Sequence, residues 1–134
     1  MTRRYILKNL TLVIVFVAIV NLMASVFHWY YLVWWFDMPM HFLGGVSVFY
    51  LSALVLLPKL QQVSNRRFLF KSILGALFLG VLWEALELFL HIRYGSPDFI
   101  LLDSISDVFF DLAGAFVGAF CLASALNTHT KEQM

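Results

Sequence analysis

The least ordinary stretch of this chain reads Asp103-Ser-Ile-Ser-Asp107-Val-Phe-Phe-Asp111-Leu-Ala-Gly114-Ala-Phe-Val-Gly118. Its three aspartates are spaced four residues apart and lead into an apolar segment with two glycines. At about 100° per residue, these five residues fall within roughly an 80° arc of a helix. One helix face therefore carries acid at one end and small residues below it. Carboxylates near hydrocarbon are unfavourable, so their presence indicates a role.

The composition around this stretch is that of a membrane protein. Of 134 residues, 62% are hydrophobic and only 13% are charged. A soluble domain of this length needs far more polar surface. The single cysteine, Cys121, excludes an intrachain disulfide and a metal site built from several thiolates.

Four apolar segments are long enough to cross a bilayer of about 30 Å at 1.5 Å per residue. We therefore predict an all-α membrane protein, a bundle of four transmembrane helices that forms one integral membrane domain over residues 1–134. The connections are short, so consecutive helices should be antiparallel neighbours. The predicted spans cover residues 9–27, 40–57, 68–90 and 105–126.

The distribution of charge predicts the orientation. Eight of the nine Lys and Arg residues lie on one side of the predicted bundle, and only Arg93 lies on the other. Because basic residues concentrate in the cytoplasm, both the N- and the C-terminus should be cytoplasmic. Seven of the eight acidic residues lie at or near the opposite, outer ends of the helices.

An aromatic segment, residues 27–36, connects the first two predicted spans. Trp and Tyr favour the level of the lipid headgroups, so we predict an interfacial segment on the outer surface. It could serve simply as a membrane anchor, or as a platform for a lipid or glycolipid headgroup.

Two further spans repeat this arrangement, with ionisable residues at the outer end of a helix face and small residues deeper on the same face. Glu84, Glu87 and His91 fall within roughly a 60° arc late in the third span. Asp37 and His41 share one face at the start of the second span. Small residues let helices approach closely in lipid, and this would bring the ionisable ends together.

Crowded carboxylates repel, so some must be protonated, paired or bound to a metal. Oxygen ligands with one or two histidines suit Mg²⁺, Mn²⁺, Ca²⁺ or Zn²⁺, which makes a divalent metal the candidate cofactor. Asp37 is a neighbouring site residue, and Asp103 fits the N-cap of the last helix. A buried polar network that holds the helices in register is the structural alternative. The candidate catalytic residues are Glu84, Glu87, Asp107 and Asp111, and the candidate metal ligands are His41, Glu84, Glu87, His91, Asp107 and Asp111.

Three motifs in this order resemble the VanZ-like and YjdF-like small bacterial membrane proteins: Asp37-x3-His41, Glu84-x2-Glu87 and Asp107-x3-Asp111-x2-Gly114-x3-Gly118. The resemblance implies a multi-pass protein of the bacterial inner membrane. For VanZ itself it implies glycopeptide resistance. Glu87 and Asp111 stand where VanZ proper commonly has amides, which is nearer the YjdF-like variant.

Three function classes fit the sequence. The first is an outward-facing Asp/Glu/His site that binds or acts on a lipid or lipid-linked headgroup in the cell envelope, with or without a metal. The second is an ion- or proton-coupled carrier, and the third is a structural or partner-binding membrane protein. Whether the protein is an enzyme is left open. The expected partners are membrane lipids, with a second copy of the chain as a further candidate and with no nucleic acid.

Overall fold

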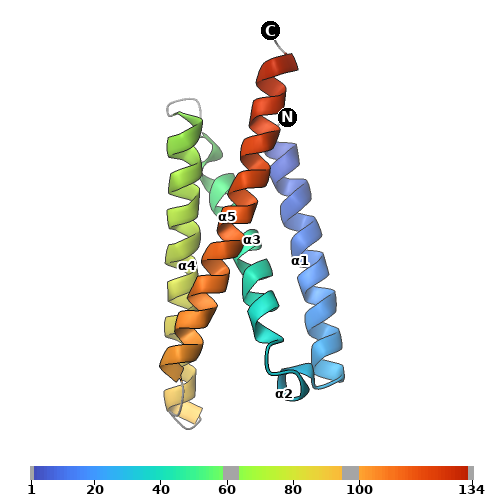
Figure 1. Cartoon of the computed structure of the whole chain (residues 1–134), viewed down its shortest axis with the longest axis vertical. Coiled ribbons are helices and arrows are strands. Elements are labelled where there is room, and N and C mark those ends of the chain that lie inside the picture. The colour runs from blue at the N-terminus through green and yellow to red at the C-terminus, as the bar shows by residue number, and fades with distance from the viewer. Residues whose placement is uncertain (1, 59–63, 95–99, 133–134) are drawn as a thin grey trace.

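The computed structural model describes residues 2–58, 64–94 and 100–132, and its regular elements there are all helices (Figure 1). The chain is all-α, as the sequence predicts. The elements are α1 (Thr2–Val26), the short α2 (Trp29–Leu32), α3 (Asp37–Leu56), α4 (Asn65–Tyr94) and α5 (Ile100–Glu132).

Four helices in the described residues, namely α1, α3, α4 and α5, are long and apolar enough to cross a membrane. They contain the four predicted spans almost entirely. All four helices begin before the predicted spans, and α4 and α5 also end after them. Hydropathy marks the hydrocarbon layer, whereas backbone hydrogen bonds continue the helix into its polar flanks. The first helix thus already includes Arg3, Arg4 and Lys8.

The helix α3 lies at the centre of the packing. It contacts α5 most extensively, and α1 and α4 also pack against it. In Figure 1, α4 and α1 lie on opposite sides, with α3 and α5 between them, and the start of α1 and the finish of α5 lie at the same end. The opposite end holds α2 and the first turn of α3, and we call it the acidic end.

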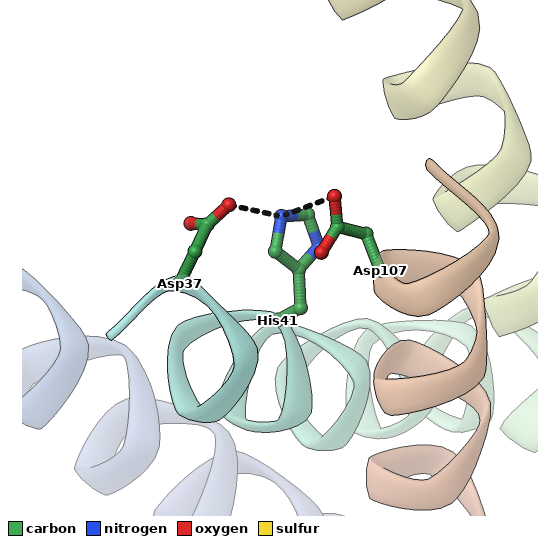
Figure 2. A group of neighbouring side chains, drawn as sticks. All are labelled: Asp37, His41 and Asp107. Carbon is green, nitrogen blue, oxygen red and sulfur yellow. Dashed lines mark ion pairs between the residues drawn. The ribbon is translucent and has the colours of Figure 1, made fainter. Parts of the chain in front are cut away.

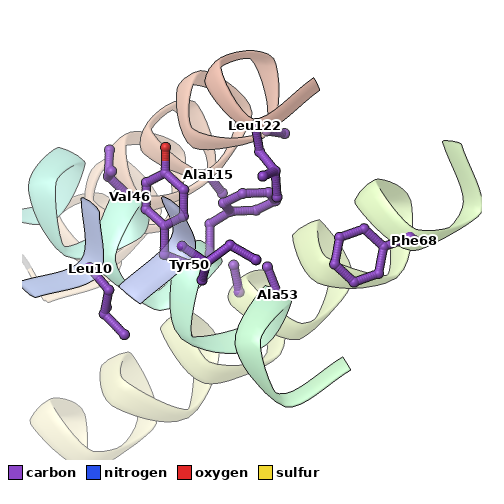
Figure 3. Close-up of a cluster of buried hydrophobic side chains, with 11 residues drawn as sticks. Leu10, Val46, Tyr50, Ala53, Phe68, Ala115 and Leu122 are labelled. Atoms are coloured by element: carbon purple, nitrogen blue, oxygen red, sulfur yellow. The ribbon is translucent and has the colours of Figure 1, made fainter. Parts of the chain in front are cut away.

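The hydrophobic core joins α3 to the other three long helices. Its fully buried side chains include Phe49, Phe68, Ile6 and Leu122 (Figure 3). These residues lie toward the end that is opposite the acidic end. Most of the remaining large apolar side chains are exposed, which fits a surface surrounded by lipid rather than water.

The closest helix approach is between α3 and α5. A methyl group at Gly45 would overlap the backbone of Asp111, and one at Gly114 would overlap the carbonyl of Phe42. The two backbones are therefore in direct contact, as small residues permit in a membrane. This contact fixes the position of the α5 aspartates relative to the start of α3.

The aromatic segment forms a tight turn at the acidic end. His28 has a positive φ of 57°, which lets the chain reverse after α1. Phe36 is buried and forms edge-to-face pairs with the rings of Trp29 and Tyr30, at centroid distances of 5.5 and 5.0 Å. Tyr31 is 89% exposed, so part of the segment is free to meet headgroups, as an interfacial position requires.

Candidate functional site

Four carboxylates converge on the imidazole of His41, in the first turns of α3. Figure 2 shows the ring between Asp37 and Asp107. The ring nitrogen Nε2 lies 3.7 Å from Asp37 Oδ2 and 3.8 Å from Asp107 Oδ2. The other nitrogen, Nδ1, lies 3.8 Å from Glu84 Oε1 and 3.6 Å from Asp111 Oδ1. Each nitrogen therefore faces its own pair of carboxylates.

Local helix geometry and helix packing together build this cluster. Asp37 and His41 are one turn apart on α3, and Asp107 and Asp111 are one turn apart on α5, so each pair shares a face. The contact between the α3 and α5 backbones brings these two faces together. Glu84 joins from α4, which packs against both helices.

Most of the cluster is buried, although the side chain of Asp37 is 41% exposed, and the ion pairs to His41 are too long for hydrogen bonds. The four nitrogen–oxygen distances, 3.6–3.8 Å, exceed the roughly 2.7–3.2 Å of a hydrogen bond. Glu84 is only 7% exposed and Asp107 only 4%. Within the described part of the chain, Glu84 Oε1 is buried and has no hydrogen-bond partner. Buried polar atoms in proteins are nearly always hydrogen-bonded, so an unpartnered one calls for an explanation, and a bound ion is one.

Two sets of side chains have the spacing of metal ligands. The first set comprises Asp37, His41 and Asp107, and the second comprises His41, Glu84 and Glu87. In each set, the ligand atoms lie within 4.8 Å of one another. Ligands on opposite sides of an ion are about 4 Å apart for Mg²⁺ and about 5 Å apart for Ca²⁺, so small rotations of the side chains would complete either set.

Glycines make room for the Asp111 carboxylate. A methyl group at Gly80 of α4 would lie 2.9 Å from Asp111 Oδ2, and one at Gly44 of α3 would lie 3.5 Å from Oδ1. The side chain of Asp111 therefore occupies a gap that only small residues leave between these helices.

A cavity of about 980 Å³ lies beside the cluster. Asp37, His41, Glu87 and Asp111 line one part of it, and the rest of the lining is mostly apolar and comes from α1, α3 and α4. The cluster therefore adjoins a space large enough for a small ligand.

Two polar residues that line this cavity, Asn21 and Tyr30, are not among the predicted site residues. The Tyr30 hydroxyl donates a hydrogen bond to Asn21 Oδ1 at 2.9 Å, and both residues line the cavity. Burial, together with the carboxylates of Asp37 and Glu87, raises the pKa of Tyr30, which keeps its hydroxyl protonated. An amide such as Asn21 inside an apolar span is a signal that the sequence does contain.

The structure places most predicted site residues together, with two exceptions. The side chain of His91 lies outside the described residues. The prediction that Asp103 caps the last helix is wrong, because α5 begins at Ile100 and Asp103 lies exposed within its first turn. The residues brought together are Asp37, His41, Glu84, Glu87, Asp107 and Asp111.

Comparison with known proteins gives one family. Neither the curated proteins nor the solved structures include a match to this chain. The resemblance to VanZ-like and YjdF-like proteins stays a prediction. A family model described as "Predicted membrane protein (DUF2238)" matches residues 1–131, and the chain therefore belongs to this family of predicted membrane proteins.

Proposed function

We propose that the cluster around His41 binds a divalent cation and, through it, the phosphate-bearing headgroup of a membrane lipid in the cell envelope. The observation that carries this proposal is the unpartnered, buried Oε1 of Glu84, which points at His41 from 3.8 Å. A metal ion between these two groups would give Oε1 a partner, which no hydrogen-bond donor in the described residues does.

The charge of the cluster supports a cation. Asp37, Glu84, Asp107 and Asp111 surround one imidazole, so negative charge exceeds positive charge even if His41 is protonated. Like charges a few ångströms apart in a poorly solvated site repel strongly. A divalent cation removes this repulsion and uses the same oxygens as ligands.

The two ring nitrogens of His41 face different carboxylates, and this indicates where the cation would lie. A neutral histidine offers one nitrogen to a metal and donates a hydrogen bond from the other, commonly to a carboxylate. Glu84 and Asp111 face Nδ1, on the side where Glu87 and Asp111 line the cavity. Asp37 and Asp107 face Nε2. We therefore assign the cation to the Nδ1 side and the orienting hydrogen bond to the Nε2 side.

Binding of phosphate follows from the chemistry of such a cation. A divalent ion held by a few protein oxygens keeps free positions and polarises phosphoryl oxygens that occupy them. Without a cation, the same carboxylates would repel phosphate. The position inside the transmembrane helices favours a lipid over a soluble phosphate compound as the natural ligand.

A carrier function finds less support. The half of the bundle opposite the acidic end is filled by core side chains, among them Phe49, Phe68 and Leu122. A transported ion would need a chain of polar groups through that half, and the buried polar side chains described there are two serines, Ser52 and Ser72.

Binding of Mn²⁺ to the detergent-purified protein, followed by electron paramagnetic resonance, tests the proposal. Wild-type protein should bind Mn²⁺, and glycerol 3-phosphate should alter the signal of the bound ion. Glu84→Gln should lower the Mn²⁺ affinity at least about tenfold, or roughly 1.4 kcal/mol. A chelator should lower the melting temperature of the wild-type protein.

Asp103→Asn is the matched control, because Asp103 is an exposed carboxylate at the same end of the bundle. It should leave the Mn²⁺ affinity unchanged. Equal losses in Glu84→Gln and Asp103→Asn would mean that any acid near the membrane surface attracts the ion, and the site proposal would be abandoned. The absence of Mn²⁺ binding by wild-type protein would have the same consequence.

A further inference from the structure

We infer that the cavity beside the cluster holds an acyl chain of a phospholipid, which enters sideways from the bilayer between α1 and α4. The inference rests on the proposed function for the position of the phosphate and adds the class of lipid and its route of entry. Its basis is the shape, the polarity and the depth of the cavity.

The cavity is lined by two helices, α1 and α4, that do not pack together. Lining residues come from α1 (Val17 and Asn21), from α3 and from α4. Helices α1 and α4 each pack against α3, and in the described residues they barely contact each other. In Figure 1 they lie on opposite sides of α3. The cavity thus has α3 as its floor and the two outer helices as walls, and all of its lining residues except Tyr30 lie within the candidate membrane spans.

Polar and apolar groups are separated along the cavity. The acidic end contributes Tyr30, His41 and Glu87, together with the Asn21 amide. Farther along the same helices, the lining is apolar and includes Val17, Val48, Leu51 and Leu79. A ligand that matches this pattern has a polar head at the cluster and a hydrocarbon chain that runs toward the middle of the membrane.

The length of the apolar part matches one leaflet of a bilayer. Leu51 follows His41 by ten residues on α3, which corresponds to roughly 15 Å of helix. Half of a hydrocarbon core of about 30 Å is also about 15 Å. A phospholipid chain spans one leaflet, so a phosphate at the cluster would place the end of the chain near Leu51.

The length and the two-part lining of the cavity suit a lipid. From Asp37 to Leu51 the lining extends over fourteen residues of α3, or roughly 21 Å, which is long enough for a headgroup and one acyl chain in line. The ionisable lining at the acidic end matches a charged headgroup, whereas an apolar transmembrane helix of a partner offers no group to pair with it.

A photoreactive phosphatidic acid with a diazirine on its acyl chain tests the inference in Mn²⁺-loaded, full-length protein. Cross-links identified by mass spectrometry should concentrate on Val17, Val48, Leu51 and Leu79. Leu79→Trp fills the cavity and should reduce this labelling at least fivefold. Val81→Trp adds the same bulk to an exposed α4 position that does not line the cavity, and should leave the labelling unchanged.

The Mn²⁺ affinity of the same samples separates the two proposals and shows that the variants are folded. Normal Mn²⁺ binding with labelling spread evenly over the exposed faces of α1, α4 and α5 would overturn the acyl-chain site and leave the metal site standing. Labelling confined to the cavity in protein that binds no Mn²⁺ would support the chain site and overturn the proposed function.

A second copy of the chain is the competing occupant. Leu79→Cys in a Cys121→Ser background tests this, because the described part of the chain contains no other cysteine. Efficient disulfide-linked dimers in the membrane would show that protein covers the cavity and would overturn the inference. Monomers that remain sensitive to lipid labelling would support it.

Discussion

At the scale of single residues, the two nitrogens of His41 divide the cluster into two parts with different tasks. Glu84 and Asp111 face Nδ1, whereas Asp37 and Asp107 face Nε2. On the proposed assignment, carboxylates of the first pair are direct ligands. Those of the second pair hold the imidazole in the tautomer whose Nδ1 is free for the cation. Asp107 is then a positioning residue, which acts through His41.

Asp107→Asn should consequently weaken Mn²⁺ binding by roughly 10- to 100-fold, the range for loss of a partner that orients a metal ligand. It should also shift the ¹⁵N resonances of the His41 imidazole, because an amide orients Nε2–H differently from a carboxylate. A change confined to overall stability would not move these resonances. Asp103→Asn, four residues earlier on α5, should change neither quantity. Unchanged His41 resonances in Asp107→Asn would contradict the positioning role.

At the scale of helices, sequence periodicity predicts well which residues share a face of one helix. It predicts poorly which helices lie next to one another. The four-residue spacing of Asp107 and Asp111, and of Asp37 and His41, places each pair on one face of its own helix whatever the tertiary structure. The glycines below them indicate close packing, and the contact of Gly114 with the α3 backbone confirms it. These local signals suffice to predict that the acidic ends meet.

Other features depend on distant parts of the chain. The cavity arises because α1 and α4 flank α3 without closing on each other. The Asn21–Tyr30 hydrogen bond depends on the turn at His28, which folds α2 back toward the end of α1. No periodicity within one helix encodes that arrangement. The error at Asp103 has a local cause, since hydropathy locates the apolar layer but not the first hydrogen-bonded turn of α5, which begins at Ile100.

The contact of α3 with α5 predicts different effects on stability for alanine substitutions at two adjacent glycines, Gly44 and Gly45. Gly45→Ala would drive a methyl group into the backbone of Asp111, so the helices must separate. We expect a loss of roughly 1–3 kcal/mol in unfolding free energy and weaker Mn²⁺ binding, because the α5 aspartates move away from His41. Thermal unfolding in detergent, with the Mn²⁺ titration, measures both.

Gly44→Ala is the control for this prediction. Its methyl group would lie 3.5 Å from Asp111 Oδ1, an ordinary contact. Because alanine favours helix over glycine by up to about 1 kcal/mol, this variant should be as stable as wild type or slightly more so. Similar destabilisation by the two substitutions would show that the backbone contact does not determine the geometry of the site.

At the scale of the whole molecule, the basic residues and the His41 cluster lie at opposite ends of the bundle. The first turns of α1 carry three basic residues, Arg3, Arg4 and Lys8. The start of α4 carries three more, Arg66, Arg67 and Lys71. The His41 cluster lies at the other end of the bundle, the acidic end. The start of α1 and the finish of α5 are at the same end of the bundle (Figure 1). Basic residues favour the cytoplasm, so this arrangement predicts that the cluster faces outward.

A fluorescent reporter that folds only in the cytoplasm tests the orientation. Fused after Met134, it should fluoresce, whereas fused after Leu32 in a truncated chain it should stay dark, because one span has been crossed. Replacing Arg3, Arg4 and Lys8 with alanine should lower the fluorescence of the full-length fusion, since these residues bias the first helix. A dark fusion after Met134 with a bright one after Leu32 would reverse the orientation. The phosphate site and the opening of the cavity would then belong to the cytoplasmic leaflet, and lipids of that leaflet would be the ligands to test.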